Sequence, residues 1–341
     1  MDNPVLVEVT RGNRVESRHR GSVAIVDDEG KLVFGIGDVK QGVFARSAVK
    51  ALQALPLVES GAADALDLDE AEIALACASH NGEAVHAGTA GMMLRKAGLS
   101  VEDLMCGTHW PRYIEDSAKL IEAGEGPCPL HNNCSGKHAG FLGLAKVVGV
   151  PTANYTDYDH PVQKEIRNVF ECMAGEIVGA DTCGTDGCSI PTYAMGLENT
   201  AKAFARFGTG TGLDEERAKA AERIYEACVN EPYMVAGRER FCTDIMDIFR
   251  GRVFVKTGAE GVFCASIPEL GYGVALKCDD GAPRAAENMM ASVLNALLER
   301  NDEEEQVLST WLNKPLKNWN SIHVGDVRVV SDFAKLLKAQ A

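Results

Sequence analysis

Strand-like patterns of apolar and polar residues occupy both ends of the chain. Alternating or short apolar runs rich in Val, Ile and Phe, bounded by turn residues, are typical of β-strands. Such runs predict strands at residues 4–10, 21–28, 31–37, 252–256, 261–266, 271–278 and 323–331. The string Asp27-Asp28-Glu29-Gly30 predicts a hairpin turn between the second and third of these strands.

Between these two regions the apolar residues recur at helical spacing. The predicted helices cover residues 47–58, 69–77, 83–97, 100–105, 136–148, 160–175, 192–207 and 214–229, and an amphipathic helix over 284–300 follows. Helix-start signals support two of them, with Asp69 followed by Glu72 and Ser100 followed by Asp103. Strands grouped at the two ends predict an α/β fold with one antiparallel sheet, rather than alternating βαβ units. We expect a single catalytic domain over 1–341, with the sheet from about 1–40 and 252–332 and a helical block at about 45–250.

Composition narrows the classes of function. The 341 residues are 46% hydrophobic and 24% charged, which is typical of a globular protein. A net charge of −15 argues against nucleic acid or an anionic membrane as a partner. No stretch approaches the roughly 18 apolar residues of a membrane span. The early charged residues leave no room for a secretory apolar segment, so we expect a cytoplasmic protein.

Eleven cysteines are many for such a chain, and without an export signal they are expected to be reduced. Cys77, Cys264 and Cys278 lie in apolar runs and are predicted to pack in the core. Cys134 and Cys188 differ because they lie in polar, glycine-containing turns, where functional sites are usually built. No C-x-x-C pair exists, so spacing alone does not indicate a metal site.

Three short motifs carry candidate chemistry. Ser47-Ala48-Val49-Lys50, Ser79-His80-Asn81 and Lys256-Thr257-Gly258 read as S-x-x-K, S-x-N and K-T-G, the set used by acyl-transfer enzymes with a Ser/Lys nucleophile. Residues three apart share a helix face, so the Ser47 hydroxyl would lie beside the Lys50 amine as its base. On this motif alone, the alternative is that Ser47 caps a helix and Lys50 is solvated. Lys256 follows a predicted strand and would project from the sheet toward the helix carrying Ser47.

Longer strings resemble a known family. They include residues 46–56, 76–83, 131–138, 186–188 and 256–261. In these strings, and over nearly its whole length, the chain resembles the rhizobial-type (class 3) L-asparaginases, relatives of the serine β-lactamase and glutaminase fold. The resemblance implies a serine β-lactamase-like α/β fold and hydrolysis of L-asparagine to L-aspartate and ammonia.

The resemblance also implies site residues. It pairs Ser47 with Lys50 and Ser79 with Lys256 as the catalytic groups, and it implies a zinc ion held by Cys134, Lys137 and Cys188. Family members are generally dimeric, so a homodimer is expected.

Three further residues are candidates for contact with the substrate. Arg46 could bind the α-carboxylate, and Asp186 could bind the α-ammonium group or a zinc ligand. His138 could contact the substrate or serve as a structural hydrogen-bond partner.

Several alternatives share parts of this pattern. A penicillin-type hydrolase or peptidase uses the same three motifs, but its substrates lie outside the cytoplasm. A glutaminase or another Ser/Lys amidohydrolase is closer, since asparagine and glutamine differ by one methylene. A non-catalytic zinc-binding protein would keep Cys134 and Cys188 but would not need two Ser/Lys pairs.

Overall fold

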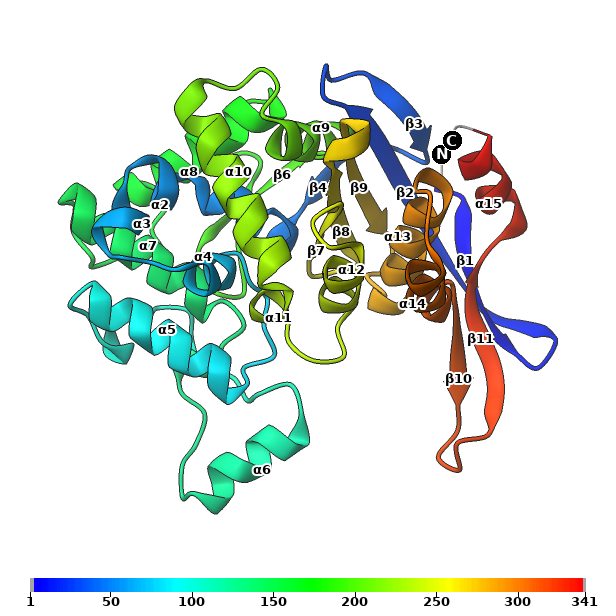
Figure 1. Cartoon of the computed structure of the whole chain (residues 1–341), viewed down its shortest axis with the longest axis horizontal. Coiled ribbons are helices and arrows are strands. Elements are labelled where there is room, and N and C mark those ends of the chain that lie inside the picture. Colours follow the sequence, from blue (N-terminus) through cyan, green and yellow to red (C-terminus); the bar gives the residue numbers. More distant parts are fainter. Residues whose placement is uncertain (1–2, 340–341) are drawn as a thin grey trace.

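The computed structural model describes residues 3–339 and combines a broad antiparallel sheet with a large helical region (Figure 1). The strands are β1 (Val5–Arg11), β2 (Arg14–Asp27), β3 (Leu32–Ile36), β4 (Gly42–Phe44), β5 (Cys183–Thr185), β6 (Pro191–Gly196), β7 (Phe254–Thr257), β8 (Val262–Ile267), β9 (Tyr272–Cys278), β10 (Asn313–Lys317) and β11 (His323–Val329). The main sheet has the order β10-β11-β1-β2-β9-β8-β7, with β3 also pairing β2.

Strands from the two chain ends meet inside this sheet. β1 pairs β11 and β2 pairs β9, both antiparallel, with Val7 opposite Val329 and Ala24 opposite Ala275. The prediction of an antiparallel sheet built from both ends is therefore confirmed. The hairpin turn is confirmed too, because the Gly30 N–H donates to the Asp27 carbonyl and β2 pairs β3.

Helices fill most of the chain between β4 and β7. They are η1 (Arg46–Val49), α1 (Lys50–Gln53), α2 (Leu55–Glu59), α3 (Ala62–Ala65), α4 (Glu70–Ala76), α5 (Ala84–Lys96), η2 (Val101–Asp103), α6 (Ile114–Glu122), η3 (Pro129–His131), α7 (Ser135–Val148), α8 (Pro161–Ala174), α9 (Leu197–Thr209), α10 (Glu215–Asn230), α11 (Pro232–Val235) and α12 (Phe241–Phe249). The helices that follow β7 are η4 (Pro268–Leu270), α13 (Pro283–Leu297), α14 (Asp302–Leu312) and α15 (Ser331–Lys338). None of these helices, within residues 3–339, is both long and apolar enough to cross a membrane.

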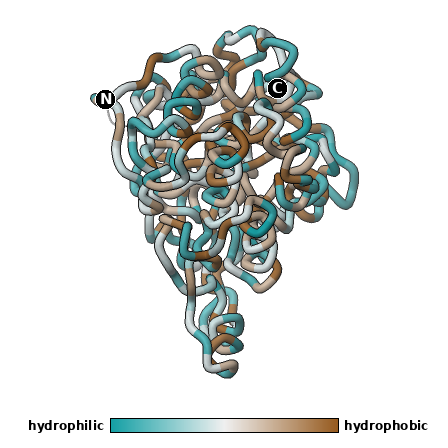
Figure 2. Tube along the Cα trace, turned by 90° about the vertical axis from the view of Figure 1, so that its left-hand side faces the viewer, coloured by the Kyte–Doolittle hydropathy of each residue, from teal (hydrophilic) through white to brown (hydrophobic). Residues whose placement is uncertain are grey.

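Helices cover both faces of the sheet. Phe254 of β7 stacks on Phe204 of α9, at 6.0 Å between ring centroids. Phe263 of β8 pairs with Thr257 of β7, which is three residues after Phe254. Because side chains alternate between the two faces along a strand, Phe263 points to the face opposite that of Phe254. There it packs against Phe241 of α12. Figure 2 shows the hydrophobic segments gathered in the interior, with hydrophilic ones around them. Helices of the region between β4 and β7 thus pack on both faces of the sheet, α9 on one and α12 on the other.

The predicted helix over 47–58 is wrong as a continuous element. The chain forms η1, α1 and α2 in succession instead. Pro56 contributes to the break, because its ring has no N–H and crowds the carbonyl four residues earlier. The predicted helix over 192–207 is wrong in its first turn, where β6 pairs β4 and β5 in a small second sheet.

Close backbone contact fixes α9 on the sheet. A Cβ on Gly273 of β9 would lie 1.9 Å from the Ala201 carbonyl oxygen of α9. We therefore expect Gly273→Ala to destabilise the protein by about 3 kcal/mol, measured as a lower urea midpoint. Gly88→Ala is the matched control, because Gly88 lies within α5 and its Cβ would meet nothing within 4 Å. That exchange should stabilise by up to about 1 kcal/mol, and a fall as large as that of Gly273→Ala would contradict the packing argument.

Candidate active site

Three separated segments bring the motifs together. Ser47 lies in η1, Ser79 follows α4, and Lys256 lies on β7, the edge strand next to the helical region. Gly258 permits this approach, because a Cβ there would lie 2.6 Å from the Ala45 carbonyl oxygen, just before η1. The Ser79 N–H donates to the Val235 carbonyl at 2.9 Å, which ties the serine loop to α11.

Both motif lysines converge on one hydroxyl. Lys256 Nζ lies 2.8 Å from Ser79 Oγ, and Lys50 Nζ lies 3.1 Å from the same oxygen. Lys50 also donates to the carbonyls of Ala78 and Asn133, so its contacts account for all three protons of an ammonium group. Among the residues that the structure describes, Lys256 has one further acceptor, the Thr257 carbonyl at 3.0 Å. Two fully buried amines therefore share the Ser79 oxygen.

The surroundings of Lys256 change its pKa. Burial lowers the pKa of Lys256 to about 7, and the positive charge of Lys50 contributes to this shift. A lysine with this pKa is partly neutral at pH 7 and can accept a proton there.

The hydrogen bonding of Ser47 differs from the predicted Ser47–Lys50 pair. Within residues 3–339, no hydrogen bond joins the Ser47 hydroxyl to Lys50 or to another group. The preceding residue, Arg46, has a φ of 52°, so the chain enters a tight 3₁₀ turn rather than an ordinary helix. The long Lys50 side chain turns toward Ser79 instead. The structure therefore joins Lys50 and Lys256 to Ser79, rather than forming separate Ser47–Lys50 and Ser79–Lys256 pairs.

Ser47 and Ser79 nevertheless line the same pocket, of about 360 Å³. Its wall is completed by His80 and Asn81 next to Ser79 and by residues from five further segments: His109, Trp110, Arg112, Asn133, Arg240, Thr257, Gly258, Ala259, Glu260, Pro283 and Glu287. A larger cavity of about 550 Å³ lies beside it and shares Glu260, but it contains neither serine nor either lysine. The smaller pocket is therefore the candidate active site.

Arg46 and Asp186 bind each other. The Asp186 carboxylate accepts from Arg46 Nε, and from Arg46 Nη2 at 3.3 Å. Burial alone would raise the pKa of Asp186, but the hydrogen bond from Arg46 and the charge of Lys137 lower it overall. This ion pair lines a narrow gap together with Ser47, Lys50 and Lys137, and Arg46 also lines the 550 Å³ cavity, but neither residue lines the 360 Å³ pocket.

His138 is fully buried in α7 and also lies outside that pocket. Its Nδ1 lies 2.7 Å from the Tyr155 hydroxyl, and burial lowers its pKa well below the usual range. Direct contact of His138, Arg46 or Asp186 with substrate stays a prediction.

The three predicted zinc ligands are close neighbours. Lys137 Nζ lies 3.0 Å from Cys188 Sγ, and Cys134 and Cys188 are near enough to shift each other's pKa. The contact with Cys188 lowers the pKa of Cys134 against the effect of burial, while that of Cys188 is raised. All three side chains are buried. Two thiols and an amine that converge in the interior form a donor set that fits zinc.

The family comparison adds a finding that geometry alone does not give. The model of the family described as L-asparaginase II matches residues 7–329, nearly the whole chain. The chain belongs to the L-asparaginase II family. This confirms the resemblance to rhizobial-type L-asparaginases, and the protein is an enzyme that hydrolyses the amide of asparagine. A search of curated proteins found no match.

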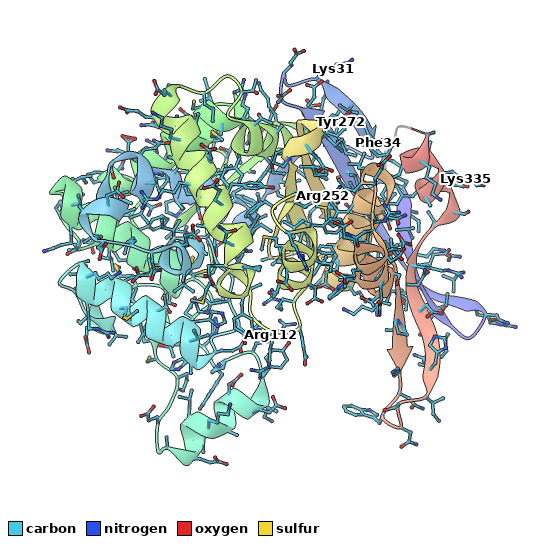
Figure 3. All side chains as sticks on the ribbon, viewed as in Figure 1. Lys31, Phe34, Arg112, Arg252, Tyr272 and Lys335 are labelled. Carbon is cyan, nitrogen blue, oxygen red and sulfur yellow. The ribbon has the colours of Figure 1, made fainter. Side chains whose placement is uncertain are left out.

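Several pocket residues of this L-asparaginase were not predicted from its sequence. Arg112, Arg240 and Glu287 come from loops or helices without a recognisable motif, and Glu260 lies within the K-T-G string but received no role. Figure 3 labels Arg112 between α6 and α11. Only the fold brings these charges to the two serines.

Proposed function

We propose that this chain hydrolyses L-asparagine to L-aspartate and ammonia by covalent Ser/Lys catalysis in the 360 Å³ pocket. The observation that carries the proposal is the convergence of Lys50 and Lys256 on Ser79, in a pocket that Ser47 also lines. A serine β-lactamase-like fold, a homodimer and a cytoplasmic location belong to the same proposal, on the strength of the sequence and the family likeness.

Ser47 is the proposed nucleophile. Its hydroxyl is free of protein hydrogen bonds within residues 3–339, whereas Ser79 already binds two amines. As Ser47 Oγ attacks the side-chain amide carbon, its proton passes to Ser79, and the Ser79 proton passes to the neutral Lys256 amine. The positive charge of Lys50 stabilises the anionic oxygens that form during this transfer. Ala259, whose backbone N–H has no partner within the described residues, lines the pocket and can donate to the oxyanion.

Collapse of the tetrahedral intermediate breaks the carbon–nitrogen bond. Lys256 returns its proton through Ser79 to the leaving nitrogen, which departs as ammonia and leaves an aspartyl ester on Ser47. Water then attacks the ester with Lys256 again as the base, and aspartate is released. Ser79 is thus a proton relay in both halves of the reaction.

Zinc belongs to the proposal as a bound group beside this pocket. Cys134, Lys137 and Cys188 would hold it, with Lys137 binding as a neutral amine. When bound, zinc supplies fixed positive charge and Lewis acidity near the catalytic lysines. The chain's own contribution is to bury the three ligands and to hold Asp186 nearby by its bond to Arg46.

Loss of one thiol should remove the metal. Cys188→Ser is expected to lower the zinc content of the purified protein from roughly one per chain to near zero, measured by atomic emission. Cys183→Ser is the matched control, because Cys183 lies on β5 and its thiol donates to the Gly184 carbonyl. Equal zinc in both variants would contradict the ligand set. After chelation, a raised KM with an intact fold indicates a metal that positions substrate, and unfolding indicates a structural metal.

The test of the proposed reaction is ammonia release together with mapping of the acyl-enzyme. Ammonia should be released from L-asparagine, more slowly from L-glutamine, and a chromogenic β-lactam should not be hydrolysed. Acid quenching of the reaction, followed by peptide mass spectrometry, should find an aspartyl group on Ser47. An aspartyl adduct on a residue outside the pocket, or rapid turnover with neither serine acylated, would overturn the covalent mechanism.

A further inference from the structure

The pocket that holds Ser47 and Ser79 carries charge of both signs on its wall. Arg112 and Arg240 supply two guanidinium groups, and Glu260 and Glu287 supply two carboxylates. A free amino acid carries one charge of each sign next to its Cα. The pocket therefore matches a zwitterionic substrate more closely than a neutral amide.

Arg240 stands out among these groups by its partners. Its Nη1 donates to Asn81 Oδ1 at 2.9 Å and to the Ser79 carbonyl at 3.3 Å. Within residues 3–339, no carboxylate forms an ion pair with it. Arg238, two residues earlier, differs because it binds Asp116 at 2.7 Å and Glu83 at 3.0 Å. Burial lowers the pKa of Arg240 and the charge of Arg112 lowers it further, while the charges of Cys242 and Glu287 raise it. This cation is therefore partly buried and, within residues 3–339, forms no ion pair.

The position of Arg240 suits a short substrate. Its guanidinium touches the backbone of Ser79, whose hydroxyl is shared by the two lysines. In asparagine the carboxyl carbon and the amide carbon are separated by two other carbons, and at bond lengths of about 1.5 Å they lie at most about 4 Å apart. A carboxylate held by Arg240 therefore leaves the amide of the same molecule within the reach of the serines.

Arg46 is the rival for this role, because it precedes the nucleophile. Its guanidinium, however, is already bound to Asp186, and Arg46 does not line the 360 Å³ pocket. Binding a substrate carboxylate there would first require separating that ion pair. Arg240 requires no such exchange.

We propose that Arg240 binds the α-carboxylate of the substrate and so restricts this enzyme to free amino acid amides. Arg240 presents its fork of N–H donors to the carboxylate, while Arg112 adds a second positive charge at the pocket wall. Side-chain amides of asparagine residues within a peptide lack the free carboxylate and are not substrates. The inference rests on the proposed function, since it concerns the same pocket.

The test compares two substrates in two variants. 3-Aminopropanamide keeps the amide and the amino group of asparagine but lacks the α-carboxylate. Arg240→Gln should raise KM for L-asparagine by about 100-fold, as expected for loss of one partner of a desolvated charge pair, with a much smaller change in kcat. For 3-aminopropanamide, kcat/KM should stay within about threefold of the wild type. Arg240→Lys keeps the positive charge but loses the paired N–H donors of the guanidinium group. Its KM for L-asparagine should lie between those of the wild type and Arg240→Gln.

A structural role for Arg240 would give a different result. If Arg240 only orders the Ser79 loop, Arg240→Gln lowers kcat/KM for both substrates by the same factor, and the inference is overturned. It is also overturned if Arg46→Gln weakens L-asparagine selectively while Arg240→Gln does not. Should Arg240→Gln unfold on circular dichroism, the comparison is made with Arg240→Lys, where an unchanged KM for L-asparagine contradicts recognition by the fork. Failure of the proposed function itself appears separately, as a wild-type enzyme with no serine adduct.

Discussion

Ser47→Ala is expected to lower kcat for asparagine hydrolysis by at least about 10⁴-fold, with the folded state unchanged. Alanine removes the only oxygen that attacks the amide carbon in the proposed mechanism, and Lys50, Lys256 and Ser79 remain in place. Because Ser47 makes no protein hydrogen bond within residues 3–339, its loss leaves no buried partner unsatisfied. Ammonia release measures the activity, and urea unfolding checks the fold.

Ser79→Ala is the matched comparison. It removes the relay but keeps the nucleophile, so the expected loss is smaller, about 10²- to 10⁴-fold, and a slow acyl-enzyme should still form on Ser47. The reverse pattern, an adduct on Ser79 in the Ser47→Ala variant and none in the Ser79→Ala variant, would exchange the two roles. Full activity of Ser47→Ala would remove it as the nucleophile.

The sheet could be predicted from sequence because its strands are long enough to show a pattern. β9 covers 7 residues between clear turn signals, and the second half of β2 ends at such a signal. Residues 14–20, the first half of β2, and the five residues of β10 were not predicted as strands. β4 and β5 have three residues each, too few for any periodicity, and their pairing with β6 depends on tertiary contacts. The helix start at Asp69 could be predicted because capping is local: Asp69 Oδ1 accepts from the Glu72 N–H at 2.9 Å.

The candidate site was only partly predictable for a related reason. Sequence spacing determines which backbone positions lie close together, so the backbones of Ser47 and Lys50 were correctly predicted to be neighbours. It does not fix the direction of a four-carbon side chain, and Lys50 Nζ found three acceptors around Ser79 and Asn133 instead. No sequence motif marks Arg240 as a binding residue. Its proposed role depends on the fold, because within residues 3–339 Arg240 forms no ion pair, whereas Arg238 pairs with Glu83 and Asp116.

Lys256→Met is expected to lower kcat/KM by about 10³-fold and to remove the rise of kcat/KM with pH below about pH 7. With a pKa of about 7, Lys256 is protonated below that pH and cannot accept the serine proton. In the wild type, kcat/KM should therefore rise about tenfold per pH unit up to pH 7 and level off above it. The other charged or thiol groups that act on Lys256 are Lys50, Cys242, Arg240 and Cys134. Burial raises the pKa of Cys242, and an arginine stays protonated near neutral pH, so neither accounts for a limb at pH 7.

Lys256→Met should have opposite effects on activity and on stability. The pKa of Lys256 is lowered in the folded state, so the unfolded chain binds more protons between pH 7 and the ordinary lysine range, and wild-type stability should rise with pH across that window. Lys256→Met removes a fully buried amine of similar volume, so at pH 6 the variant should unfold at a higher urea concentration than the wild type while having little activity. Lys256→Arg keeps the charge at every pH and should stay inactive up to pH 9. A limb near pH 7 that persists in Lys256→Met would show that another group is the base.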